Sequence, residues 1–121
     1  MKYFKTFVIG ILICLFIIGS SITVFAHPPK DITIEFNKET KTLKITVSHP
    51  VNPQTIKEHF IKDIKVYLND EMVIQQTFKS QSSANAQDVS YTLIDAEKGN
   101  KIKVEAQCCL IGSLDKTITI Q

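Results

Sequence analysis

Strict alternation of apolar and polar residues is the feature that most limits what this chain can fold into. Ile32, Ile34 and Phe36 alternate with polar residues, and the pattern returns at Leu43, Ile45 and Val47 after a turn-like segment. Because successive side chains of a β-strand point to opposite faces, a period of two predicts half-buried strands. The same reasoning predicts further strands over residues 60–68, 72–78, 89–94, 100–108 and 114–120. No stretch after residue 30 has the pattern of a long helix.

Seven short strands in one small domain favour an all-β fold, specifically an immunoglobulin-like antiparallel β-sandwich. Turns are expected at Asn69-Asp70 and at Lys98-Gly99-Asn100. The polar stretch from Gln75 to Gln87 is expected to be a loop that crosses from one sheet to the other. No internal repeat indicates a solenoid or a propeller.

Residues 1–26 have the pattern of a secretory signal peptide. A basic start is followed by an apolar run from Phe7 to Val24 and by a small residue, Ala26. We therefore expect cleavage after Ala26, a mature domain over residues 27–121, and an exported protein that is extracellular, periplasmic or at the cell surface. The alternative is an uncleaved anchor, since the run approaches the roughly 20 residues that span a bilayer. Contact with a membrane is expected only in that case.

The mature segment has few features that would indicate a nucleic-acid partner or a fold stabilised by disulfides. Without Lys2 and Lys5, basic and acidic residues are equal in number and every basic residue is a lysine, so no basic patch indicates nucleic acid. Cys108 and Cys109 are its only cysteines, too few for the disulfide framework of many small secreted domains. A bound metal is another way to stabilise such a domain.

Four residues form a candidate metal site: His27, His49, His59 and Cys108. All three histidines lie near the predicted ends of strands or at the start of the mature chain. Side chains two residues apart on a strand point to the same face, a rule that we call parity. By parity, His49 and Cys108 each continue the inward-facing row of their strand at the point where the strand ends. A loop histidine or a buried free cysteine is ordinary by itself. Together, however, imidazole and thiolate groups suit zinc, copper or iron, so the pattern predicts a shared metal site.

These segments also carry a resemblance to a known family. His49-Pro50, then Glu58-His59-Phe60-Ile61, and later the run from Ala106 through Cys108 to Gly112 resemble the iron domain of superoxide reductases, also known as desulfoferrodoxin or neelaredoxin. In that family a seven-stranded immunoglobulin-like sandwich holds ferrous iron with four equatorial histidines and an axial cysteine, leaving one position for superoxide. The resemblance implies that His27, His49 and His59 are histidine ligands and that Cys108 is the axial thiolate.

The chain departs from the family pattern at several positions. Ile111 stands where the family's Cys-Asn-x-His-Gly motif has the fourth histidine, and Asp63 replaces a usual tryptophan. The glutamate and lysine that precede the first histidine in the family have no counterpart here. Cys109 replaces the asparagine, and it has three interpretations: a second soft ligand, a redox partner of Cys108, or a packing residue.

These departures leave three hypotheses for function. The first is an exported iron protein that reduces superoxide with electrons from an unidentified donor. The second is a non-enzymatic immunoglobulin-like surface module. The third is a copper or zinc site that uses the ring and the free amine of His27. Three imidazoles and a thiolate would suit zinc or cuprous copper as well as iron, so the metal, the enzymatic activity and the oligomeric state stay open.

Overall fold

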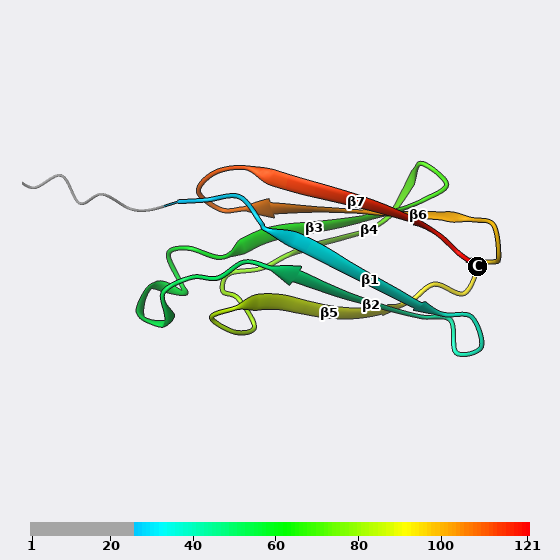
Figure 1. Ribbon diagram of the computed structural model, residues 1–121, viewed down its shortest axis with the longest axis horizontal. Helices are drawn as coiled ribbons and strands as arrows, with labels where there is room; N and C mark the ends of the chain where they lie inside the picture. The colour runs from blue at the N-terminus through cyan, green and yellow to red at the C-terminus, as the bar shows by residue number, and fades with distance from the viewer. Residues whose placement is uncertain (1–25) are drawn as a thin grey trace, which may run out of the picture.

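The computed structural model describes residues 26–121, which form seven β-strands in two antiparallel sheets (Figure 1). The all-β prediction is therefore confirmed. The predicted signal peptide lies outside the described residues, apart from Ala26. Within the described part of the chain, no helix is long and apolar enough to cross a membrane. The strands are β1 (Asp31–Asn37), β2 (Thr42–Ser48), β3 (Ile61–Leu68), β4 (Glu71–Thr77), β5 (Ala86–Thr92), β6 (Lys101–Cys108) and β7 (Ser113–Thr119).

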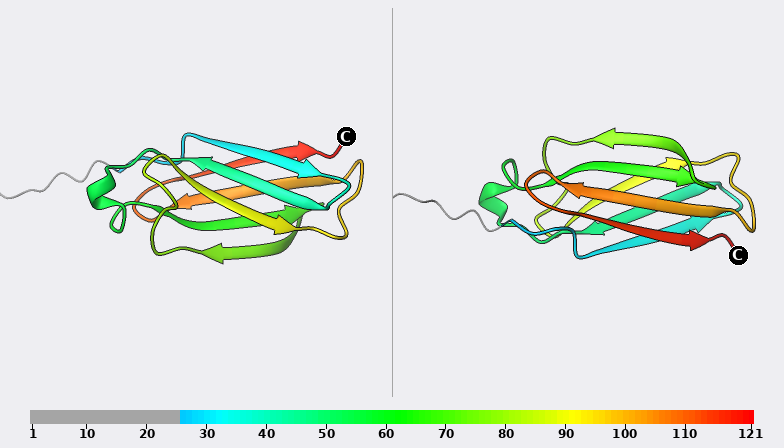
Figure 2. Two further views of the ribbon diagram at one scale, coloured as in Figure 1. Left: turned by 90° about the horizontal axis from the view of Figure 1, so that it is seen from below. Right: turned by 90° about the horizontal axis from the view of Figure 1, so that it is seen from above.

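The strands are arranged as β1-β2-β5 in one sheet and β4-β3-β6-β7 in the other. The two sheets pack face to face as layers (Figure 2). The chain crosses between sheets in the segment 78–85, as predicted, although both ends of the predicted polar loop belong to strands β4 and β5. The expected turn at Asn69-Asp70 is present, with positive φ angles of 48° and 70° that suit a tight hairpin.

The alternating apolar residues form the core between the sheets. Every second residue of β2 and of β6 is buried, because these strands present one face to the opposite sheet. The side chains that are completely excluded from solvent include Ile32, Leu43, Val47, Ile61, Ile64, Val66, Ile102 and Val104. At about 25 cal/mol per Å² of apolar surface removed from water, this core is the main source of stability.

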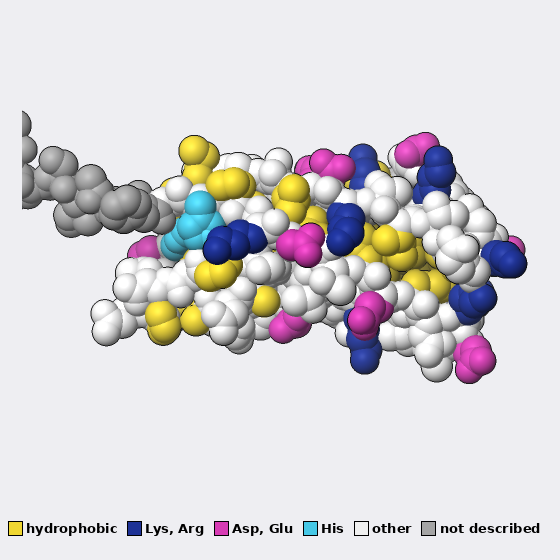
Figure 3. Space-filling model, in the orientation of Figure 1, with side chains coloured by type: hydrophobic (Ala, Val, Ile, Leu, Met, Phe, Trp, Pro, Cys, Tyr) yellow, Lys and Arg dark blue, Asp and Glu magenta, His cyan; other side chains and the backbone are white. Residues whose placement is uncertain are grey.

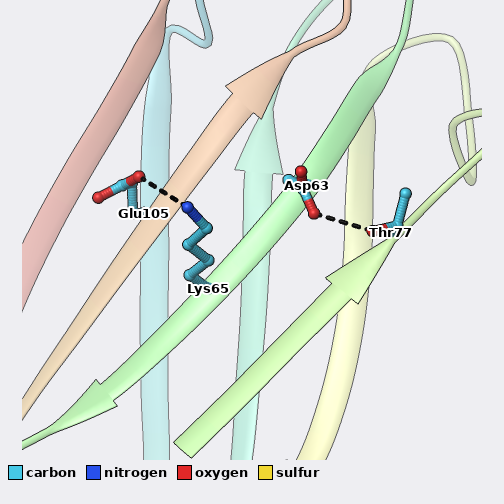
Figure 4. A network of polar contacts seen from close by, with 4 residues as sticks. All are labelled: Asp63, Lys65, Thr77 and Glu105. Atoms are coloured by element: carbon cyan, nitrogen blue, oxygen red, sulfur yellow. Dashed lines mark hydrogen bonds and ion pairs between the residues drawn. The ribbon is translucent and has the colours of Figure 1, made fainter. Parts of the chain in front are cut away.

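The outer face of the four-stranded sheet carries paired polar side chains (Figure 4). Nζ of Lys65 on β3 lies 3.9 Å from Oε1 of Glu105 on β6. The Thr77 hydroxyl donates a hydrogen bond of 3.0 Å to the Asp63 carboxylate. Ion pairs this exposed contribute about 0–1 kcal/mol. We therefore regard this face as an ordinary solvated sheet surface.

The topology gathers particular loops at one end of the sandwich. Antiparallel pairing places the start of β1, the loop 49–60 before β3, the crossing segment 78–85 and the loop 109–112 after β6 together at that end. The β1–β2 and β3–β4 turns and the segment 93–100 lie at the opposite end (Figure 1). The predicted ligands, which are distant in sequence, therefore all belong to the first end.

Candidate metal centre

The three histidines come together at this end from three separate segments. The ring centroids of His27 and His49 are 4.6 Å apart, those of His27 and His59 4.9 Å, and those of His49 and His59 4.7 Å. One nitrogen of each ring can be chosen so that all three lie within 4.8 Å of one another. Histidine surface is visible beside the start of the described chain (Figure 3).

Local structure explains how His59 reaches the cluster. The loop after β2 contains a short 3₁₀ helix, Pro53–Thr55, whose first turn is capped by the Asn52 side chain. Proline is favoured at such a first position because its fixed φ suits the helix and no amide hydrogen is needed there. The His59 amide then donates to the Thr55 carbonyl at 2.9 Å. This capped turn fixes the loop in front of β3 and so places His59.

The His59 ring shows the clearest need for a partner. The residue is only 5% exposed, and its Nε2 is buried with no hydrogen-bond partner among the described residues. Burial lowers the pKa of His59 below its ordinary value, and the nearby rings of His49 and His27 lower it further, while the His27 backbone acts in the opposite direction. A buried nitrogen without a partner is costly. A neutral imidazole with an unpaired nitrogen fits a metal ligand.

The His49 ring is completely buried where β2 ends. Its Nδ1 lies 2.8 Å from Oε1 of Gln81, and its Nε2 lies 3.2 Å from the carbonyl oxygen of His27. The parity prediction that His49 continues the inward row of β2 is confirmed by this burial. Gln81 was not among the predicted residues, and nothing in its polar, serine-rich surroundings marks it in the sequence.

The His27 ring is partly exposed and lies between two backbone carbonyls. Its Nδ1 is 2.9 Å from the Pro28 oxygen, and its Nε2 is 2.8 Å from the Pro50 oxygen. A neutral imidazole has only one N–H, so it donates to one of these oxygens and turns a lone pair toward the other. A cation would be a better partner for that lone pair, and the remaining N–H would keep its carbonyl, as metal-bound histidines commonly do.

The spacing of the three rings suits a metal after a small adjustment. Zinc–nitrogen bonds of about 2.0–2.1 Å in a tetrahedral site place two ligand nitrogens about 3.4 Å apart. The nitrogens of the cluster lie within 4.8 Å of one another. Ring rotations that close the remaining distance of at most about 1.4 Å would complete a three-histidine site. The donor set therefore fits a transition-metal ion.

Cys108 is buried at the end of β6, as parity predicts, and is 3% exposed. Its Cα pairs with that of Ile61, two residues after His59, and its Sγ accepts a weak hydrogen bond of 3.5 Å from the Leu110 amide. The group of mutually close donor atoms in the described chain consists of the three histidines and does not include Cys108. Its role as the thiolate ligand stays a prediction.

The Cys109 thiol lies against the loop that carries His59. Its Sγ accepts a hydrogen bond from the Phe60 amide and donates one to the Glu58 carbonyl, both at 3.4 Å. Burial raises the pKa of Cys109, and its neighbour Cys108 raises it further. A protonated thiol that bonds to backbone supports the packing interpretation of this residue.

The loop after Cys109 presents apolar side chains where the resemblance would place a histidine. Leu110 and Ile111 are 46% and 56% exposed. Gly112 has a φ of 80°, and a Cβ at this position would lie only 2.6 Å from Cβ of Pro28. The loop therefore packs tightly against the residue next to His27, although it contributes no imidazole.

Comparisons with known proteins place this chain in a family and match its fold to a solved structure. The sequence model of the desulfoferrodoxin family matches residues 23–116. Among solved structures, a superoxide reductase (neelaredoxin) from Ignicoccus hospitalis is similar, with a TM-score of 0.55 and 21% sequence identity. That alignment covers 77% of this chain and 80% of the other. Comparison with curated proteins gave no match. At this identity the structural likeness shows a shared fold.

Proposed function

Because the chain belongs to the desulfoferrodoxin family, we propose that it binds a mononuclear non-haem iron ion and reduces superoxide. His27, His49, His59 and Cys108 would hold the ion. The observation that supports this most strongly is the cluster of three imidazoles, two of them buried, in which Nε2 of His59 has no other partner in the described chain. We also propose that the protein is exported, on the basis of residues 1–26.

Each ligand has a distinct part in holding the ion. His49 is rigid because its ring is fully buried and hydrogen-bonded, and His59 is held neutral by burial. His27 is the most accessible of the three and therefore the best placed to adjust as the site closes. Bound iron would supply the single electron that, with two protons, converts superoxide to hydrogen peroxide. An external donor would have to return that electron.

Ile111 limits the ligand set, because an isoleucine side chain cannot bind a metal. With three histidines and one cysteine, fewer protein ligands would surround the iron than in the rest of the family. The site would then have more positions open to water or substrate. We expect slower superoxide reduction than in a full site, since the charged residues that precede the first histidine in the family are also missing.

Metal analysis of three proteins tests this proposal. Wild type, Cys108→Ser and Cys109→Ser would be loaded anaerobically with ferrous iron, followed by iron analysis, visible absorption of the oxidised form and superoxide consumption. We expect about one iron per chain in wild type and Cys109→Ser, with a thiolate-to-iron absorption band that is absent from Cys108→Ser. Wild-type protein that binds no iron would refute the proposal.

A three-histidine site without the thiolate is a second candidate, because Cys108 lies outside the group of mutually close donor atoms. Zinc accepts three histidines with water in the fourth position. In this case Cys108→Ser would keep its metal while His59→Ala would lose it. Zinc retention by Cys108→Ser, with no thiolate absorption in the wild-type iron form, would favour this candidate.

A further inference from the structure

Gln81 lies in the crossing segment between β4 and β5 and is 5% exposed. Its amide makes four hydrogen bonds. Oε1 is 2.8 Å from Nδ1 of His49 and 3.2 Å from the backbone amide of Ile61. Nε2 donates to the carbonyl oxygens of His49 at 2.7 Å and of Ser83 at 3.0 Å. A buried side chain with every polar atom engaged holds a single orientation.

Backbone partners determine which end of this amide faces His49. The carbonyls of His49 and Ser83 accept only, so they require the NH₂ group, whereas the Ile61 amide donates only and requires the oxygen. Turning the amide over would set its single oxygen against two carbonyl oxygens and its NH₂ group against the Ile61 N–H. The oxygen of Gln81 therefore faces Nδ1 of His49, independently of the state of the imidazole.

This oxygen in turn selects the tautomer of His49. An acceptor at 2.8 Å requires a proton on Nδ1, and in a neutral ring the lone pair then lies on Nε2. The opposite tautomer would keep the longer contact of Nε2 with the His27 carbonyl, at 3.2 Å, but would place two lone pairs against each other at Gln81. The Nδ1–H tautomer turns the Nε2 lone pair toward the His27 carbonyl oxygen instead, but at the longer distance of 3.2 Å in a partly buried contact. The shorter, fully buried contact with Gln81 is therefore the one that is kept.

We propose that Gln81 is a positioning residue that holds His49 as the Nδ1–H tautomer and so presents its Nε2 to the metal. Because the same oxygen also binds the first amide of β3, one side chain ties the end of β2 to the strand that follows His59. Two of the three ligand segments are thereby held together before any metal binds. The inference rests on the proposed function only in that His49 is taken as a ligand.

Gln87 provides a matched control, because it is equally buried at the start of β5 but bonds elsewhere. Its Oε1 accepts from the Ser82 amide at 3.1 Å, and its Nε2 donates to the Asp88 carbonyl at 3.1 Å. It is 4% exposed. Replacing either glutamine by methionine removes a buried amide of the same length, but only Gln81→Met removes the acceptor for His49.

The first measurement is the tautomer of His49 in metal-free protein labelled with ¹⁵N, from long-range ¹H–¹⁵N correlations at about pH 8, where an ordinary imidazole is neutral. We expect a proton on Nδ1 and none on Nε2 in wild type and in Gln87→Met. In Gln81→Met we expect the proton on Nε2, donated to the His27 carbonyl. A proton on Nε2 in wild type would overturn the inference, even if Gln81→Met failed to fold.

The second measurement is a titration of each protein with Co²⁺ under anaerobic conditions. We expect Gln81→Met to bind Co²⁺ at least about tenfold more weakly than Gln87→Met, in line with the loss of a partner of a metal-bound histidine. Gln81→Glu keeps an acceptor oxygen and should recover much of the affinity. Equal affinities of the two methionine variants would overturn the positioning role. Wild-type protein with the expected tautomer but no bound Co²⁺ would refute the proposed function and leave the tautomer assignment standing.

Discussion

Replacing Gly112 by alanine should weaken metal binding by displacing the segment that carries His27. Gly112 has a φ of 80°, and a Cβ there would lie 2.6 Å from Cβ of Pro28. Aliphatic carbons prefer separations of about 3.5–4.0 Å, so one of the two groups must move by about 1 Å. Pro28 is exposed and directly follows His27. We therefore expect Pro28 to move and to carry the His27 ring with it.

The variant Gly99→Ala is the control for this prediction. It carries the same cost of placing an alanine in a left-handed backbone conformation, but it displaces no neighbouring residue. The φ of Gly99 is 88°, and a Cβ there would meet nothing within 4 Å. Either alanine variant should lose about 1–2 kcal/mol of unfolding free energy, because a left-handed backbone is unfavourable for a residue with a Cβ. Since the overlap at Gly112 is relieved by movement of an exposed residue, the two losses should be similar. The two variants should differ in metal affinity.

Urea denaturation and Co²⁺ titration of both variants test this prediction. We expect Gly99→Ala to bind Co²⁺ like wild type, and Gly112→Ala to bind about tenfold or more weakly, as when a ligand's support is lost. Equal affinities at equal stability would refute the reasoning, since they would show that the position of Pro28 does not control His27 or that His27 is not a ligand.

Stability and thiol reactivity provide three further tests of the geometry. Because the pKa of His59 is lower in the folded protein than its ordinary value of 6.5, the unfolded chain takes up this proton first. Stability of the metal-free protein should thus fall as the pH drops below 6.5 toward the lowered pKa, and denaturation of His59→Gln should show a weaker pH dependence. Ile64→Ala should cost about 2–5 kcal/mol in urea denaturation, because Ile64 is fully buried, whereas Ile94→Ala, at a residue 75% exposed, should change stability by less than about 0.5 kcal/mol. Cys109 should react slowly with a thiol reagent at about pH 7, because burial raises its pKa, and comparable reactivity to a free thiol would contradict the bonded arrangement described above.

Strand prediction succeeded where alternation reflects burial on one face. The bounds of β2 and β6 differ from the predicted ones by only one residue at any end, because every second residue in them is apolar. The prediction was less exact at β5, which begins at Ala86 rather than at residue 89. There the buried position belongs to Gln87, a polar residue that the apolar pattern does not detect.

The site was predictable to the extent that it depends on parity within one strand. The burial of His49 and Cys108 follows from the inward rows of β2 and β6. The place of His27 beside His59 does not follow from parity, because neither residue belongs to a strand. Gln81 could not be predicted at all, since its contacts join a loop to two strand ends across 32 and 20 residues of sequence.

By itself, the sequence determined the all-β class, the number of strands and the chemical character of the ligands, because alternation and residue type are local properties. Only the tertiary structure decided that three histidines from separate segments meet, that Nε2 of His59 has no partner among the described residues, and that the Gln81 side-chain oxygen lies 2.8 Å from Nδ1 of His49. These features depend on the pairing of strands far apart in the chain, which places loops together at one end of the sandwich. A local pattern holds no information on such distances, because they are set by how the two sheets pack.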